Sequence, residues 1–376
     1  MSEYQYYEFQ AIDRPLDIAA QKALRALSSR AQITATSFTN TYQWGDFKGN
    51  ADTLMNEWFD LHLYLANWGT RRLMIRIPER FVDRHVVDAC LRGSECAKSR
   101  VAGDHLILDI ELQEVETEWD DGPGWLASLA PLRADLLSGD PRLLYLIWLM
   151  SVEFDLVSAD TPEPVLGVGP MTGSLEAFTS FFCLNPDLIA AAAERDGVPG
   201  GDSIPLSTAR EVISGMTDHE KVSFLSRLFD GEPHIAIALR SEVKRRLDAG
   251  RETPKVTPRT AGELRARAAE IGVAREVEAA RQAAEERARQ ARKDEEKRRE
   301  QIIAIARRGE GVWRDVEAEI ERGNATAYDR AAGLLVDLKA VAEERDALSD
   351  FTRRVVAIRD RYARKGRFLQ RIEHLA

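Results

Sequence analysis

The first third of the chain alternates between strand-like and helix-like patterns of apolar positions. Residues 4–12 and 33–44 are rich in aromatic and β-branched side chains, which is typical of strands. Residues 52–66 carry apolar side chains at helical spacing, which predicts one largely buried helix. Residues 105–112 alternate apolar and polar side chains, as a half-buried strand does. We therefore predict a small mixed sheet domain of the α+β class over residues 1–122.

Helical signals follow from residue 123 to residue 250. Asn185 before Pro186 is typical of a helix start, because proline is tolerated at the first helical position. Thr217 and Glu220 have the spacing of a capping box, in which side chains at a helix start bond each other's backbone N–H groups. The pattern predicts a helical domain over 123–250, followed by a proline-containing linker over 251–262.

Residues 263–308 consist largely of Arg, Glu and Ala. A continuous helix of this length spans roughly 70 Å at 1.5 Å per residue. Its apolar positions are mostly alanine, which buries little area, so the pattern favours a solvated spacer helix over a close-packed partner helix. Apolar periodicity returns in residues 309–376 and predicts a C-terminal helical module.

Charge is unevenly distributed over a chain of net charge −10. Residues 251–376 contain 29 Lys and Arg against 24 Asp and Glu, so the excess of acidic residues lies in residues 1–250, the front part of the chain. This asymmetry favours contacts between the two parts, or head-to-tail contacts between chains, and argues against a large nucleic-acid face in the front part. Three cysteines, no apparent secretory signal and a longest apolar run at 143–150 predict a cytoplasmic protein without disulfides or a membrane span.

Three segments place a tryptophan beside glycine, at residues 44–49, 67–72 and 119–125. Exposed aromatic rings beside polar groups form many ligand and peptide sites. The ligand-binding candidates are Trp44, Asp46, Lys48, Trp68 and Arg71. The alternative is that the rings cap the core where helix meets strand. If the flanking elements form a parallel crossover, Trp44 and Trp68 lie at opposite edges of the sheet.

Other clusters of reactive side chains lack the spacing of a known site. The acidic run at 114–121 has no EF-hand pattern and is interpreted as a solvated loop. Cys90 and Cys96, flanked by His85 and His105, do not match zinc-ligand spacing. No complete phosphate-loop, dinucleotide, nucleophile-elbow or metalloprotease motif occurs. We predict no metal, no cofactor and no catalytic residue, with a hydrolase or nuclease built from scattered front-domain residues as the alternative.

The C-terminal module ends in a basic stretch with interleaved aromatic residues. Its candidate partner-binding or nucleic-acid-binding residues are Arg359, Arg361, Arg364, Lys365 and Arg367. Cations near a helix C-terminus complement the helix dipole, so helix-end stabilisation or a protein contact is favoured. Binding of nucleic acid by the tail is a third hypothesis.

Several stretches resemble an uncharacterised bacterial, actinobacterial-type protein family. They read MSEYQYYEFQAIDRPL at 1–16, SFTNTYQWGDFKG at 37–49, LYLANWGTRRLMIRIP at 63–78 and GWLASLAPLRADLLSGDPRLLYLIWL at 124–149. The tail at 327–365 is similar to C-terminal helices of bacterial SWIM zinc-finger proteins, although the SWIM zinc ligands are absent. The resemblance implies a shared docking module, with a SWIM zinc-finger protein as a partner in a defence or regulatory complex.

These observations predict a non-enzymatic adaptor without a membrane segment. In this hypothesis the α+β and helical front recognises a ligand, the charged helix acts as a spacer, and the tail docks onto a protein partner. Whether the chain forms oligomers is left open.

Overall fold

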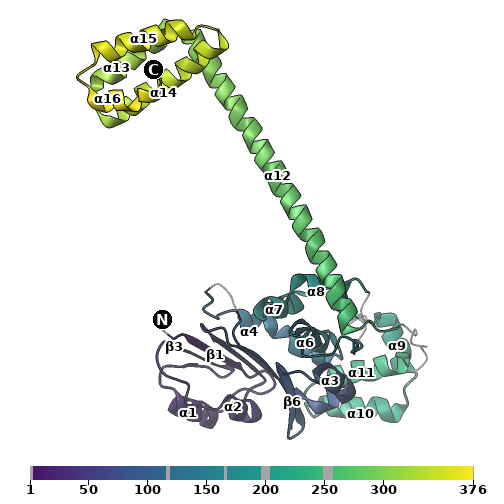
Figure 1. Cartoon of the computed structure of the whole chain (residues 1–376). Helices are drawn as coiled ribbons and strands as arrows, with labels where there is room; N and C mark the ends of the chain where they lie inside the picture. The colour runs from purple at the N-terminus through teal and green to yellow at the C-terminus, as the bar shows by residue number, and fades with distance from the viewer. Residues whose placement is uncertain (1–2, 116–118, 165–166, 196–203, 249–256, 376) are drawn as a thin grey trace. The chain divides into compact units, whose positions relative to one another are not determined.

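The computed structural model contains one sheet of seven antiparallel strands in the front of the chain (Figure 1). It describes residues 3–115, 119–164, 167–195, 204–248 and 257–375. In spatial order the strands are β2 (Gln32–Ile33), β3 (Ser37–Tyr42), β1 (Gln5–Gln10), β4 (Leu61–Ala66), β5 (Arg71–Pro78), β7 (His105–Leu112) and β6 (Ala97–Ala102). The α+β class is confirmed, but the sheet is antiparallel rather than mixed.

The main difference lies in residues 52–66, which form a short helix and a strand instead of one helix. Helix α2 (Ala51–Glu57) begins where the Asn50 side chain accepts a hydrogen bond from Thr53 N, and it ends at Trp58. In β4, Leu61 and Leu65 point into the same core. Their spacing of four fits a helix as well as alternate positions of a strand, so periodicity alone could not separate the two.

Each face of the sheet is covered by helices. Helices α1 (Ile18–Leu27) and α2 pack on one face around Phe9, Phe38 and Met74. The opposite face packs against a larger helical layer. Its helices are α3 (Arg84–Leu91), α4 (Trp125–Leu129), α5 (Pro131–Leu137), α6 (Arg142–Glu153), α7 (Gly173–Phe181) and α8 (Pro186–Ala193).

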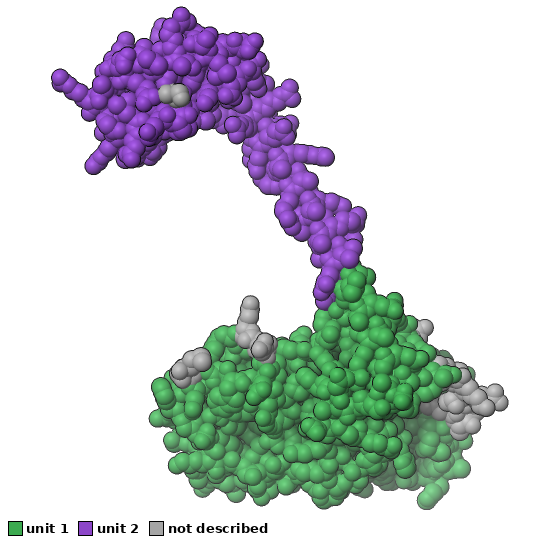
Figure 2. All heavy atoms as spheres, in the orientation of Figure 1, with its two compact units in different colours: residues 1–274 green, residues 275–376 purple. Residues whose placement is uncertain are grey.

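The sheet and this helical layer share one apolar core. It joins Tyr6 and Leu108 of the sheet to Trp148 of α6 and Phe178 of α7, and it continues to Leu264. The core therefore crosses the boundary that the sequence predicted at residue 122. All of these residues belong to a compact unit, Met1–Ala274, called unit 1 below (Figure 2). Unit 1 also holds helices α9 (Leu206–Ser214), α10 (Asp218–Phe229) and α11 (Ile235–Asp248).

Helix α12 (Ala261–Arg308) is the predicted long charged helix, and residues 273–301 are exposed along it. The predicted linker at 251–262 lies partly outside the described residues, and its last two residues already belong to α12. None of the described helices is long and apolar enough to cross a membrane.

The second compact unit, Arg275–Ala376, is called unit 2. After the last turns of α12 it contains α13 (Glu310–Arg322), α14 (Ala325–Glu344), α15 (Leu348–Arg361) and α16 (Gly366–Arg371). Val316, Leu335, Val355 and Phe368 are among the side chains of its separate apolar core. Because this core closes without side chains from unit 1, each unit is held together by its own packing.

Candidate functional site

The first two tryptophan loops meet at one end of the sheet. Gln5, at the start of β1, pairs with Tyr42 at the end of β3 and with Ala66 at the end of β4. Trp44 and Trp68 each lie two residues beyond one of those strand ends. The expectation that they lie at opposite edges is wrong, because it placed Trp68 before a strand in a parallel crossover. Trp68 instead follows β4, which runs in the same direction as β3.

Tyr4 brings the third tryptophan loop to the same place. Its backbone N–H donates to Asn67 Oδ1 at 2.9 Å, and its carbonyl accepts from Asn67 N at 3.0 Å. Its hydroxyl donates to the carbonyl of Asp121 at 2.7 Å, and its ring lies 5.2 Å from the Trp119 ring. One residue at the start of the sheet therefore connects the loop of Trp68 with the loop of Trp119.

Gln5 holds the first loop in a similar way. Its side-chain amide donates to Gly45 O at 3.4 Å and to Asp46 Oδ1 at 3.1 Å. Its side-chain oxygen accepts from the hydroxyls of Tyr7 at 2.7 Å and Tyr64 at 3.2 Å. Because the Gln5 side chain is bonded both to the loop and to two tyrosines of the sheet, it fixes the loop that carries Trp44 to the sheet.

Two glycines allow the loops to pack this closely. Gly69 has a φ of +89°, and a Cβ there would lie 2.6 Å from the backbone N of Val115. Gly122 has a φ of +90°, and a Cβ would lie 2.5 Å from the Tyr6 ring. A side chain at either position would be strained and would push the loop away from the sheet.

The three tryptophans at this end are exposed to solvent. Trp44 is 76% exposed, Trp68 is 47% exposed and Trp119 is 68% exposed. The other four tryptophans of the chain are at least partly buried. The alternative interpretation, in which Trp44 and Trp68 cap the core, is therefore wrong. Together with Tyr4, these three side chains form a surface that we call the aromatic rim.

Carboxylates outnumber basic groups around the aromatic rim. Among the described residues of the three loops and beside Tyr4, the acidic side chains are Glu3, Asp46, Glu114, Asp120 and Asp121, and the exposed basic one is Lys48. The pKa of Tyr4 is raised by burial and then by the negative charges of Asp121 and Asp120. A surface of exposed aromatic rings with a negative potential is thus built from three loops.

Arg71, a predicted ligand contact, is instead buried at 4% exposure. Its guanidinium donates to Phe181 O at 2.7 Å and lies 3.4 Å from Asp120 Oδ2. It also lies 5.0 Å from the centre of the Phe181 ring and 5.9 Å from that of Trp125. Arg71 supports the loop of Trp119 from beneath and does not face solvent.

The basic residues of the tail differ in how they are engaged. Arg361 pairs with Glu317 at 2.7 Å, and Lys365 donates to the carbonyl of Ile320 at the end of α13. For the side chains of Arg359, Arg364 and Arg367, no ion pair or hydrogen bond occurs within the part of the chain that the structure describes. Part of the predicted basic patch therefore stabilises unit 2 itself.

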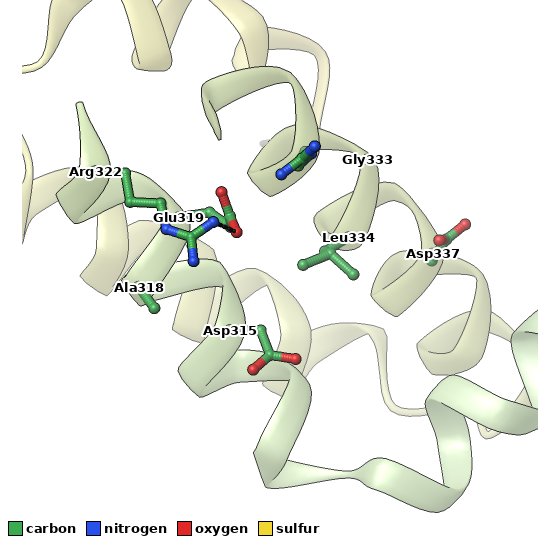
Figure 3. Close-up of a pocket in the computed structure, with 8 residues that line it drawn as sticks. Asp315, Ala318, Glu319, Arg322, Gly333, Leu334 and Asp337 are labelled. Carbon is green, nitrogen blue, oxygen red and sulfur yellow. Dashed lines mark hydrogen bonds and ion pairs between the residues drawn. The ribbon is translucent and has the colours of Figure 1, made fainter. Parts of the chain in front are cut away.

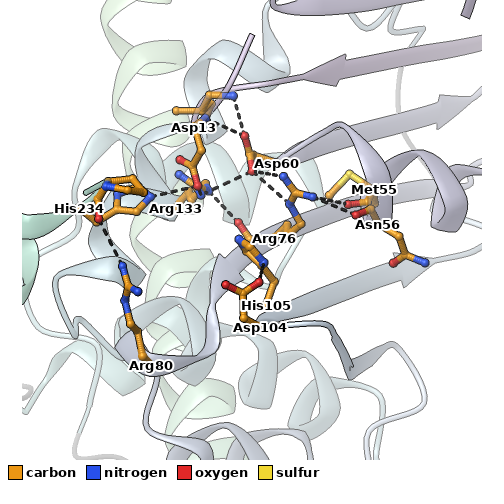
Figure 4. A network of polar contacts seen from close by, with 12 residues as sticks. Asp13, Met55, Asn56, Asp60, Arg76, Arg80, Asp104, His105, Arg133 and His234 are labelled. Atoms are coloured by element: carbon orange, nitrogen blue, oxygen red, sulfur yellow. Dashed lines mark hydrogen bonds and ion pairs between the residues drawn. The ribbon is translucent and has the colours of Figure 1, made fainter. Parts of the chain in front are cut away.

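A buried ionic network in unit 1 contains a histidine beside a carboxylate (Figure 4). His234 Nε2 lies 3.0 Å from Asp13 Oδ2, and Arg133 donates to the same oxygen at 2.6 Å. Arg76 donates to Asp60 at 2.9 Å. Burial alone would raise the pKa of Asp13, but the hydrogen bond from Arg133 and the nearby His234 hold it below its usual value. No serine or cysteine among the described residues hydrogen-bonds to His234, and the network ties the start of α11 to the sheet.

The described residues contain no group of three or more His, Cys, Asp and Glu side chains placed to hold a metal ion. No family model, no curated protein and no solved structure matches the chain. The resemblances of the front segments and of the tail therefore remain predictions. The site has to be interpreted from its own geometry, in which Tyr4 and Gln5, not predicted from the sequence, organise the loops.

Proposed function

We propose that the protein is a non-enzymatic adaptor and that the aromatic rim of unit 1 binds a basic segment of a partner protein. The observation that carries the proposal is that all three exposed tryptophans converge on the start of β1, among five carboxylates. Tryptophan and tyrosine dominate the binding energy of protein interfaces.

A cationic side chain suits this surface better than a neutral or acidic one. The face of an indole ring attracts Arg and Lys, an interaction of roughly 0.5–2 kcal/mol. A carboxylate beside the ring adds charge-assisted hydrogen bonds to the same cation. Asp120 already accepts from Arg71 and from the Trp125 indole. The exposed Asp121 lies two residues from Trp119, and the exposed Asp46 lies two residues from Trp44. Each of these tryptophans can therefore stack on a guanidinium or ammonium while its neighbours pair with the charge.

The first experiment is a titration of the full-length protein with three labelled probes at modest salt. The probes are an arginine-containing peptide, the same peptide with glutamate in place of arginine, and a neutral glucose oligosaccharide. We expect the arginine peptide to bind and its affinity to fall with added salt, because exposed charges are screened. Binding of the oligosaccharide alone, or equal binding of both peptides, would contradict the proposal.

Single substitutions locate the binding surface. We expect Trp44→Ala, Trp68→Ala and Trp119→Ala each to weaken binding about tenfold or more, because a binding hot spot contributes ~2 kcal/mol. The matched control is Ile18→Ala on α1, where an equally apolar side chain is 73% exposed away from the rim. An effect of the control as large as that of the tryptophans would place the binding elsewhere.

A further inference from the structure

A groove lies between α13 and α14 in unit 2 (Figure 3). It encloses a volume of about 440 Å³. Its lining side chains are Asp315, Ala318, Glu319 and Arg322 from α13, and Arg330, Gly333, Leu334 and Asp337 from α14. On each helix these positions follow the spacing 0, 3, 4 and 7, which is one continuous stripe along a helix.

The two stripes carry opposite charges at their two ends. The helices are joined by a tight turn at Gly323, which has a φ of +72°, so they run in opposite directions. The end of α13 and the first turns of α14 therefore lie toward the same end of the groove. Arg322 and Arg330 flank the end beside the turn, and Asp315 and Asp337 flank the other end. On each helix, seven residues separate the basic end of the groove from the acidic end, which is ~10 Å along the helix axis.

The middle of the groove has a low floor. Ala318 and Gly333 present almost no side chain there, the Leu334 side chain lies in the space between the two helices, and Glu319 lies beside it (Figure 3). Gly333 is exposed, and a Cβ added to it would meet no atom within 4 Å. The packing of α14 therefore does not require glycine at this position. Glycine inside a helix also lowers stability relative to alanine. A low floor permits a third helix to approach closely, because interaxial distances depend on the side chains at the contact.

The charges at the groove are only partly satisfied within the unit. Arg322 donates to Glu319 Oε1 at 2.5 Å, while Glu319 Oε2 is buried without a hydrogen-bond partner. Within the described residues, the Arg330 side chain has no ion pair. Asp315 forms an ion pair with Arg308, whereas Asp337 accepts from the neutral amide of Gln301 at 2.7 Å and keeps its negative charge. Arg330 at one end of the groove and Asp337 at the other therefore carry the charges that no ion pair within the described residues neutralises.

We propose that this groove binds an amphipathic helix of a partner protein in one orientation. A basic side chain of that helix meets Asp337, and an acidic side chain two turns further on meets Arg330. The partner helix runs from the acidic end to the basic end, because its positive N-terminus and negative C-terminus then face opposite charges. The proposal does not depend on the aromatic rim, and it gives the adaptor a second binding surface.

The orientation can be tested with two designed helical peptides and the full-length protein. One peptide carries arginine and, seven residues later, glutamate on its apolar face, and the other has these two residues exchanged. Fluorescence anisotropy should show about tenfold tighter binding of the first peptide. The double substitution Arg330→Glu with Asp337→Arg should invert this preference. Equal affinity for the two peptides, or no binding of either at millimolar concentration, would overturn the proposal.

Filling the groove separates binding from folding. Gly333→Leu places a side chain on the floor at an exposed helical position without a clash. We expect it to weaken peptide binding at least tenfold while the thermal unfolding temperature stays equal or rises. Gly366→Leu, at another open and exposed helical glycine outside the groove, should leave binding unchanged. Unchanged binding by the Gly333 variant would refute the groove as the site.

Two further outcomes are informative. If the unliganded protein self-associates and Gly333→Leu abolishes this, the occupant is a second copy of the chain and the partner proposal fails. If Gly333→Leu abolishes peptide binding while arginine-peptide binding at the aromatic rim is retained, the groove is supported independently of the rim. If Gly333→Leu leaves the binding of the helical peptide unchanged while arginine-peptide binding still depends on the three tryptophans, the rim is retained and the groove is overturned.

Discussion

His62 of β4 should make the stability of the protein depend on pH. Its side chain is buried at 1% exposure and stacks on Phe9 with ring centres 3.9 Å apart. Its Nδ1 lies 3.0 Å from Glu8 O. Burial lowers the pKa of His62 to about 3, against an ordinary value of 6.5. The imidazole therefore stays neutral in the folded protein at any pH above about 3.

The sign and size of the effect follow from proton binding. Below pH 6.5 the unfolded chain takes up a proton at His62 that the folded chain does not, so acid favours unfolding. For one proton, the free energy of unfolding falls by about 1.4 kcal/mol per pH unit. Between pH 6 and pH 4.5 this amounts to roughly 2 kcal/mol. Carboxylates with lowered pKa values act mainly below this window, because they are protonated in the unfolded chain only near pH 4.

The assay is urea unfolding of the wild-type protein and of His62→Phe at several pH values between 6.5 and 4.5. Phenylalanine keeps an aromatic ring against Phe9 and removes the titrating group. We expect the wild-type protein to lose stability with acid more steeply, by about one proton, and His219→Gln, at an exposed position, to behave like wild type. The reasoning is refuted if His62→Phe and wild type show the same dependence on pH.

Three further experiments test the packing of unit 1. Asp60→Ala should destabilise unit 1 by about 3–5 kcal/mol, because it removes the buried carboxylate with which Arg76 pairs. Asp104→Ala, at an 85% exposed carboxylate, should change urea unfolding by less than ~0.5 kcal/mol. Asp109 has a lowered pKa, because hydrogen bonds and charge from Arg72 outweigh the effect of burial. The Asp109→Asn variant should therefore be less stable than wild type at pH 7, and this difference in the free energy of unfolding should shrink toward pH 2. A difference that stays constant with pH would contradict the prediction. Trp148 is 1% exposed, and Trp148→Ala should lower the free energy of unfolding by about 3–5 kcal/mol. Trp44 has about a quarter of its side chain buried, and Trp44→Ala should lower it by about 1 kcal/mol or less. Comparable shifts in the thermal unfolding temperatures of the two variants would show that Trp44 is buried.

Local signals in the sequence predicted local structure well. Helix α8 begins at Asn185 and Pro186, and α10 begins with the capping box of Thr217 and Glu220, as the sequence indicated. These signals depend on side chains that bond to backbone within three residues, so they need no knowledge of the fold. The long helix was also predicted from local sequence, because residues 273–301 consist largely of strongly helix-forming residues.

The candidate site depended on contacts that local patterns do not contain. Tyr4 is bonded to Asp121, and Gln5 to Asp46, across 117 and 41 residues of sequence. The tryptophan and glycine pairs were visible in the sequence, but their convergence follows from the antiparallel pairing of β1 with both β3 and β4. Arg71 was misassigned because a guanidinium beside a tryptophan loop has the same local pattern whether it faces solvent or the core.

The central claim is that the aromatic rim is the recognition surface of unit 1. The most direct measurement is a heteronuclear NMR spectrum of the indole N–H signals of all seven tryptophans during titration with the arginine-containing peptide. We predict that the signals of Trp44, Trp68 and Trp119 shift together and saturate at one concentration, while that of Trp148 does not move. Binding of the peptide with these three signals unchanged would contradict the claim.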